Sequence, residues 1–294
     1  MSESRMEVVP QKKKRVWGWP AVANFVLGGM ASGFYLLHFE GSERGFVSRP
    51  QDTIFSLLSP LLIMIGFFIV TFEAGRPIRG IYLLGNLKNS WMSREILSGT
   101  IFVVAATINW LSPHAVLYYL SVVAVSVYLI SQGFIIYYAR AVTAWNVPLV
   151  PILFITSGLV AGYGLLLIVT SLSELAFSIQ FIVTGIVCLV LNLSVYTFYV
   201  LLHLRNCAFL RATAILRNPV SLIVTIGMGH LVPCIFLILL LSLAGLNERV
   251  RSVLFILTGL AIIIGEVFQK TLIILGGNFL RGIVIEQMQR RSID

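Results

Sequence analysis

Eight uninterrupted apolar runs, each of about 20 residues or more, dominate this chain of 294 residues. A helix needs about 20 mostly apolar residues to cross a bilayer. The runs do not alternate between polar and apolar residues, so they favour helices over the strands of a membrane barrel. The expected spans are Trp17–Phe39, Thr53–Phe72, Ser93–Ser112, Ala115–Tyr138, Leu149–Thr170, Leu175–Leu202, Val220–Ala244 and Ser252–Gly276. We therefore expect an all-α fold: a polytopic membrane protein built as a bundle of eight transmembrane helices.

Composition supports the same fold class. Hydrophobic residues make up 58% of the chain and charged residues only 11%, whereas a soluble domain carries roughly 25% charged residues. This excludes a soluble enzyme and a disordered chain. Because the connections between spans are short, we expect one transmembrane domain at 17–276, preceded by a basic cytoplasmic tail at 1–16 and followed by a C-terminal tail at 277–294.

The basic residues are distributed unevenly along the chain. Of its 21 Lys and Arg, 16 fall in the N-terminal tail, the second, fourth and sixth loops and the C-terminal tail, and only four fall in the opposite loops. The positive-inside rule then predicts that both termini are cytoplasmic. A basic face that docks an acidic partner is an alternative explanation. The net charge of +9 flanks spans instead of forming a soluble basic face, so we expect no nucleic-acid partner.

Cysteine and histidine are too scattered to form an obvious metal site. Cys188, Cys207 and Cys234 are far apart and none belongs to a CxxC pair, which argues against an iron–sulfur cluster or structural zinc within the chain. We expect no metal ligands here. His38 and His114 fall at the same membrane edge, which leaves a b-type haem as a minor alternative.

Two charged residues lie inside the last expected span, where charge is costly and by default suggests function. Glu266 and Lys270 are spaced i, i+4 with the acid first, the favourable order for an ion pair along a helix. Such a pair could serve only to make the helix insertable. His230, well inside the seventh span, is placed either for a proton-transfer role or for a hydrogen bond between helices.

A denser polar group surrounds the junction of the second and third spans. Glu73 and Arg76 follow the second span, and Arg94 and Glu95 lie in the first turn of the third. Glu95 is a candidate proton acceptor, although spacing alone favours the simpler explanation of a first-turn acid that helps the helix begin. The same membrane half or its edge also holds Asn24, Arg140, Trp145, Asn146, Glu266 and Lys270. One membrane face is therefore expected to carry the chemistry.

Two patterns of small residues predict close helix packing. Gly29 and Gly33 in the first span, and Gly158 and Gly162 in the fifth, are GxxxG spacings. Such spacings let the backbones of two helices approach each other.

Several of these stretches resemble the membrane-anchor subunit of dimethyl sulfoxide reductase and its relatives. The resemblance rests on Gly75-Arg-Pro-Ile-Arg79, on Asn89-Ser-Trp-Met-Ser-Arg-Glu-Ile96 with Ser98-Gly99, and on Ala139-Arg-Ala-Val-Thr-Ala-Trp-Asn146. The opening Trp17-Gly-Trp-Pro20 is similar to the wider polysulfide-reductase and nitrite-reductase membrane subunits. Similarity at motif level covers roughly the first 165 residues. Glu73 stands where the anchor family commonly has His or Asp.

The resemblance implies a cofactor-free, eight-helix subunit of the bacterial or archaeal cytoplasmic membrane. It would exchange electrons between menaquinone or ubiquinone and a four-cluster ferredoxin-like iron–sulfur subunit, which serves a molybdenum or tungsten bis-pterin catalytic subunit. The family's functionally important glutamate corresponds to Glu95. The candidate quinone-binding and proton-transfer residues are then Asn24, Glu73, Arg76, Arg94 and Glu95, with Arg140, Asn146, His230, Glu266 and Lys270 as secondary candidates.

The main alternative is a proton-coupled secondary transporter that uses His230, Glu266 and Lys270 as a proton relay. Transporters commonly contain internal repeats and broken helices near the membrane midplane. The sequence has no convincing internal repeat, which favours the quinone-reactive subunit.

Overall fold

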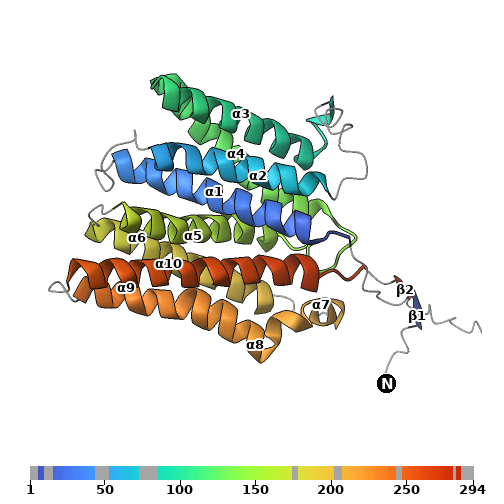
Figure 1. Cartoon of the computed structure of the whole chain (residues 1–294). Helices are drawn as coiled ribbons and strands as arrows, with labels where there is room; N and C mark the ends of the chain where they lie inside the picture. Colours follow the sequence, from blue (N-terminus) through green and yellow to red (C-terminus); the bar gives the residue numbers. More distant parts are fainter. Residues whose placement is uncertain are drawn as a thin grey trace, which may run out of the picture.

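Eight helices that are long and apolar enough to cross a membrane pack side by side in the computed structural model (Figure 1), which fits a multi-pass membrane protein. The structure describes residues 6–9, 16–43, 53–72, 85–173, 178–201, 207–242, 247–280 and 283–285. Six crossings are single α-helices: α1 (Trp19–Glu43), α2 (Thr53–Thr71), α3 (Trp91–Leu111), α4 (Ala115–Tyr138), α5 (Leu149–Leu172) and α6 (Ile179–Leu201). The predicted number of eight apolar helices is confirmed.

The last two crossings are built from several segments. The seventh joins α8 (Pro219–Leu222), the π-helix η3 (Ile223–Leu231) and α9 (Val232–Ser242). The eighth joins α10 (Glu248–Thr271) to the π-helix η4 (Leu272–Gly276). The shorter elements are α7 (Cys207–Ala212), the 3₁₀ turn η2 (Ala214–Arg217), β1 (Met6–Val9) and β2 (Ile283–Ile285).

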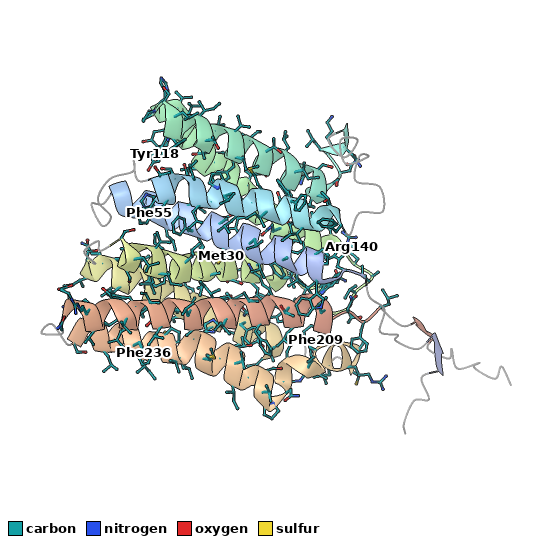
Figure 2. The ribbon with its side chains drawn as sticks, viewed as in Figure 1. Met30, Phe55, Tyr118, Arg140, Phe209 and Phe236 are labelled. Carbon is teal, nitrogen blue, oxygen red and sulfur yellow. The ribbon has the colours of Figure 1, made fainter. Side chains whose placement is uncertain are left out.

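Consecutive crossings run in opposite directions, so the bundle has two distinct ends (Figure 1). We call the end at which α1, α3 and α5 begin, and beside which β1 and β2 lie, the tail end. Figure 2 shows Arg140 and Phe209 toward this end, and Phe55, Tyr118 and Phe236 toward the other. The most enclosed crossings are α1 and α5, of which 72% and 67% are buried, against 28% for α2.

Glycines bring α1 and α5 into backbone contact. A Cβ atom at Gly162 would lie 2.1 Å from the backbone nitrogen of Phe34, and one at Gly33 would lie 2.1 Å from the carbonyl oxygen of Gly158. Real Cβ atoms do not approach that closely, so only glycine fits at these positions. The predicted packing of the two GxxxG spacings is confirmed.

Large apolar side chains cover the outer surface of the bundle. Examples that are more than 60% exposed are Phe68, Phe72, Leu111, Val116, Ile179, Phe198, Val220 and Ile223. A soluble monomer rarely exposes so extended an apolar surface. The surface is the kind that a lipid environment favours.

Capping residues move some helix starts away from the expected spans. Ser90 caps α3, so this helix begins at Trp91 and not at Ser93. Asn247 caps α10, which begins at Glu248 and not at Ser252. A hydropathy search starts such helices too late, because the capping residue and the first turn are polar. The capping side chain accepts from the free N–H groups of the first turn and so allows the helix to begin there.

The two chain ends meet at the tail end. β1 and β2 pair antiparallel, with Met6 opposite Ile285, and the backbone nitrogen of Val16 donates to Asn278 Oδ1 at 3.2 Å. The expected N-terminal and C-terminal tails are therefore joined by a small sheet, which the all-α prediction did not include. Strand pairing between sequence-distant segments leaves no local signal in the sequence.

The loop before α5 is fixed to the same end by Trp145. Its ring is fully buried, stacks on Trp17 with 4.9 Å between ring centroids, and donates from Nε1 to the carbonyl oxygen of Ile273 at 2.8 Å. That carbonyl lies in η4 near the end of the last crossing, where carbonyl groups lack partners within the helix.

Trp145→Phe is expected to destabilise the chain by about 1–3 kcal/mol, because the substitution leaves the buried Ile273 carbonyl without its donor. Thermal unfolding in detergent would measure the change. Trp19→Phe is the matched control, since Trp19 is 61% exposed. Equal loss of stability in the two variants would contradict the role of the Trp145 hydrogen bond.

Candidate functional site

The start of α3 turns Glu95 toward the interior and Arg94 away from it. Arg94 donates from Nε to the carbonyl oxygen of Leu87 at 3.0 Å and from Nη2 to that of Lys88 at 2.7 Å. Its guanidinium also lies over the Trp91 ring, 4.1 Å from the centroid. Arg94 thus fastens the preceding turn, while Glu95, the next residue around the helix, is 5% exposed.

The Glu95 carboxylate accepts hydrogen bonds from two amides on neighbouring helices. Asn24 Nδ2 of α1 lies 3.0 Å from Glu95 Oε1, and Gln132 Nε2 of α4 lies 3.3 Å from the same oxygen. Gln132 Nε2 is also 3.1 Å from the Tyr128 hydroxyl. We call Asn24, Glu95, Tyr128 and Gln132 the Glu95 cluster. All four side chains are buried, so α1, α3 and α4 enclose one carboxylate among polar groups.

Glycines make room for the Glu95 cluster. A Cβ atom at Gly28 would lie 2.2 Å from the Tyr128 hydroxyl, and one at Gly66 of α2 would lie 3.0 Å from Asn24 Oδ1. Asn24 Oδ1 itself is buried and accepts no hydrogen bond. The cluster therefore contains one acceptor that is available to a donor from outside it.

Lys270 contacts α1 at Phe25, the residue that follows Asn24 of the Glu95 cluster. Its ammonium donates to the carbonyl oxygen of Phe25 at 3.1 Å and would lie 2.4 Å from a Cβ atom at Gly29. Gln132 Nε2 approaches the adjacent carbonyl, that of Asn24, at 3.3 Å. Adjacent carbonyl groups of α1 thus bring Lys270 of α10 close to the Glu95 cluster.

A second buried polar group surrounds Glu266. Glu266 Oε1 accepts from Asn192 Nδ2 of α6 at 2.7 Å and lies 3.4 Å from His230 Nε2 of η3. His230 Nδ1 lies 2.7 Å from the carbonyl oxygen of Thr225. We call Asn192, Thr225, His230 and Glu266, together with the adjacent Ser157, Tyr196 and Gln269, the Glu266 cluster. It lies nearer the middle of the bundle than the Glu95 cluster does, since His230 is central in the crossing Pro219–Ser242 whereas Glu95 is one turn into α3.

The expected ion pair between Glu266 and Lys270 is not formed. Between described residues, the ion pairs are His230–Glu266 and Arg251–Glu248. The interior offers Lys270 a backbone carbonyl on α1 and offers Glu266 an amide and an imidazole, so the two side chains point to different neighbours. Their i, i+4 spacing does not bring the charged groups together.

Other predicted residues lie away from both clusters or outside the described residues. Arg140 is exposed, with its guanidinium 5.4 Å from the centroid of the Tyr138 ring, and Asn146 is also exposed. Glu73 and Arg76 lie outside the described residues. The structure thus brings together Asn24 with Glu95, and His230 with Glu266, but adds neither Arg94 nor Arg140 to them.

The two histidines considered for haem face different neighbours. His38 stacks on Phe55 with 4.7 Å between ring centroids. His114 caps α4, where its Nδ1 accepts from the backbone nitrogen of Val116 at 3.3 Å. Within the described residues, no three His, Cys, Asp or Glu side chains converge as a metal site would require.

Sequence reasoning missed several members of the clusters. Tyr128, Gln132, Asn192 and Gln269 complete the hydrogen bonds around the two carboxylates. They are uncharged, so a search for charged residues within spans passes over them. The available signal was the presence of amide side chains inside apolar spans, where each needs a partner.

The arrangement can hold a proton on either of two buried glutamates and can donate hydrogen bonds to a small ligand from the amides beside them. Both glutamates lie in the half of the bundle nearest the tail end. Comparison of the chain with protein-family models finds no match, and comparison with curated proteins finds none either.

Proposed function

We propose that this chain is an eight-span membrane protein and the quinone-reactive anchor subunit of an oxidoreductase complex. It would exchange electrons between membrane menaquinone or ubiquinone and a four-cluster ferredoxin-like iron–sulfur subunit. That subunit would serve a molybdenum or tungsten bis-pterin catalytic subunit. The resemblance of residues 75–99 and 139–146 to the dimethyl sulfoxide reductase anchor family motivates the proposal.

The observation that carries the proposal is the buried Glu95 carboxylate between two amide donors. Burying an ionisable group in an apolar bundle is costly and usually reflects function. Glu95 lies one turn into α3, near an end of the bundle, so a proton needs to travel only a short way between this carboxylate and water. It is also the residue that the resemblance assigns to the quinone site.

The chemistry of a quinol fits this cluster. Oxidation of a quinol releases two electrons and two protons. Its hydroxyl groups are hydrogen-bond donors, which match the acceptors Glu95 and the unpaired Asn24 Oδ1. The oxidised quinone has carbonyl acceptors, which match the N–H donors of Asn24 and Gln132. Glu95 would accept a proton as the electrons leave for the partner subunit.

A quinone also needs a site for its isoprenoid tail, and an apolar groove on the outside of the bundle could hold one. The groove lies between α2 and α3 and is lined by Thr53, Ile54, Leu57, Leu58, Pro60, Leu61, Met64 and Thr107. Along α2 the groove ends at Met64, two residues before Gly66. Gly66 packs against Asn24, because a Cβ atom there would lie 3.0 Å from Asn24 Oδ1. A tail in this groove would lie in contact with lipid and would extend from the α2 residues near Asn24 toward the opposite end of the bundle.

The positive-inside rule places the tail end of the bundle, and with it the Glu95 cluster, on the cytoplasmic side of a bacterial or archaeal cytoplasmic membrane. The partner subunits would dock there. The exposed Arg140 and the basic residues of the neighbouring loops would then face them. A complex facing the cytoplasm would suit an intracellular substrate.

Isolation of the chain from its own membrane tests the proposal. Purification in mild detergent, followed by mass spectrometry, should recover an iron–sulfur protein and a pterin-binding protein in equal amounts with the chain. Recovery of the chain alone, together with no quinone in the extract, would sink the proposal.

Proton-coupled transport is the second candidate function. The observation in its favour is that the π-helix η3 interrupts the seventh crossing beside His230 and Glu266, since broken helices often mark transporter sites. Proton-dependent uptake of a solute by the purified chain in liposomes would support this function.

A further inference from the structure

The Glu266 cluster lies outside the proposed quinone site and carries chemistry that the site does not use. Its side chains come from four crossings: α5, α6, η3 and α10. None of them is more than 1% exposed. Such a concentration of polar groups in an apolar bundle requires an explanation.

Hydrogen bonding fixes the tautomer of His230. Its Nδ1 lies 2.7 Å from the carbonyl oxygen of Thr225, and a carbonyl can only accept a hydrogen bond. Nδ1 therefore carries a hydrogen. In the neutral imidazole Nε2 is then a bare acceptor, and it faces another acceptor, Glu266 Oε1, at 3.4 Å.

The Asn192 amide faces more acceptors than it has N–H groups. Its Nδ2 lies 2.7 Å from Glu266 Oε1, 3.2 Å from His230 Nε2 and 3.4 Å from Gln269 Oε1, while Glu266 Oε1 and His230 Nε2 are 3.4 Å apart. Two N–H groups are therefore shared among three acceptors. Thr156 donates to Asn192 Oδ1 at 3.1 Å, which holds the amide in this orientation. A proton held by Glu266 Oε1 or His230 Nε2 would convert this contact between two acceptors into a hydrogen bond.

The same cluster contains polar atoms that lack partners. Glu266 Oε2, Ser157 Oγ, Tyr196 Oη, Thr225 Oγ1 and Gln269 Nε2 are all buried without a hydrogen bond. Ser157 lies within hydrogen-bonding reach of Glu266, and Tyr196 lies within reach of Thr225, whereas Gln269 Nε2 has no such partner among the described residues. Buried polar atoms are nearly always paired with protein or with ordered water. Water molecules placed among these atoms would satisfy them.

Among the described residues, the cluster does not bring together the three His, Cys, Asp or Glu side chains that a metal site would require. The titratable side chains that face Glu266 are His230 from η3, Tyr196 from α6 and Lys270 from its own helix. The Lys270 ammonium is directed to the Phe25 carbonyl oxygen on α1 and forms no ion pair with Glu266.

We propose that the Glu266 cluster is a second proton-binding site, in which Glu266 and His230 share one exchangeable proton and ordered water connects them to their neighbours. The proton comes from water and returns to it, either as an O–H on Glu266 that donates to Nε2 or as an N–H on His230 that donates to Oε1. The π-helical turn makes the site possible by placing His230 over the Thr225 carbonyl, and π-helical turns frequently mark functional positions. The site does not depend on the proposed quinone function.

Spectroscopy of the purified full chain in lipid nanodiscs, without added quinone, tests this proposal. Infrared spectra would report a protonated carboxyl group, and ¹⁵N NMR of the chain's four histidines would report whether His230 Nε2 bears a proton. We expect one of these two signals in the wild-type chain, and we expect it to respond to transfer into D₂O within minutes. Glu266→Gln should abolish it, because the amide cannot share a proton with His230.

Two matched variants separate this site from its surroundings. Glu248→Gln changes an 84%-exposed glutamate of the same helix, α10, and should leave the signal intact. Glu95→Gln should also leave it intact, which distinguishes this site from the proposed quinone site. If Glu266→Gln does not fold, the wild-type histidine spectrum, assigned with His230→Gln, answers the same question.

An ionised Glu266 together with a bare His230 Nε2 would overturn the proposal. A proton signal that remains unexchanged in D₂O for days in the folded protein would overturn it as well, because the site would then be dry.

Discussion

Replacing Glu95 by glutamine is expected to lower quinol-dependent turnover of the complex by ~100-fold or more, since a positioned general base contributes at least about that factor. The glutamine side chain retains an oxygen that can accept from Asn24 and Gln132, so the cluster should keep its shape. What it loses is the ability to take a proton. Steady-state oxidation of a water-soluble quinol by the purified complex measures the effect.

A dye that passes electrons directly to the partner subunits provides the internal control. Dye-dependent turnover of the Glu95→Gln complex should equal that of wild type, which shows that the partners remain attached and active. Glu248→Gln, on the exposed end of α10, should keep quinol turnover unchanged. Wild-type quinol turnover in the Glu95→Gln complex would remove Glu95 from the proposed mechanism.

Gly162→Leu is expected to cause a large loss of stability. A Cβ atom at this position would lie 2.1 Å from the backbone nitrogen of Phe34 and 2.2 Å from the carbonyl carbon of Gly33. Neither is a side-chain atom that could rotate away, so α1 and α5 would have to separate. Overpacking costs typically about 1–3 kcal/mol and occasionally more, and we expect a value at or above the upper end.

Thermal unfolding of the purified variants in detergent measures this effect. Gly227→Leu is the control, because Gly227 also lies in a helical crossing but a Cβ atom there would meet nothing within 4 Å. We expect its midpoint to stay near that of wild type. Equal midpoints for the two variants would contradict the backbone contact between α1 and α5.

The eight crossings could be predicted because length and apolarity alone define a membrane-spanning helix. Close packing at the glycines of α1 and of α5 could be predicted as well, since glycines four residues apart are a local pattern, but the sequence does not show that these two helices pack on each other. The π-helix η3 and the pairing of β1 with β2 could not. The first arises from packing against neighbouring helices, and the second joins segments from opposite ends of the chain.

The candidate site was predicted only in part, because the sequence identifies charged residues but not their partners. Glu95 and Asn24 were selected by position within their spans, and they do meet. Glu266 and Lys270 were expected to pair by spacing, yet each contacts another helix. Which neighbour a buried charge contacts depends on how helices rotate against one another, and rotation is determined by packing over the whole bundle.

Binding of a short-chain menaquinone to the purified chain in nanodiscs tests the central claim most directly. The wild-type chain should bind it saturably, with one site per chain, and Glu95→Gln should weaken binding by ~10-fold, the equivalent of about one charge-assisted hydrogen bond. Glu248→Gln should bind as wild type does. Non-saturable partitioning that is the same in all three proteins would contradict the account.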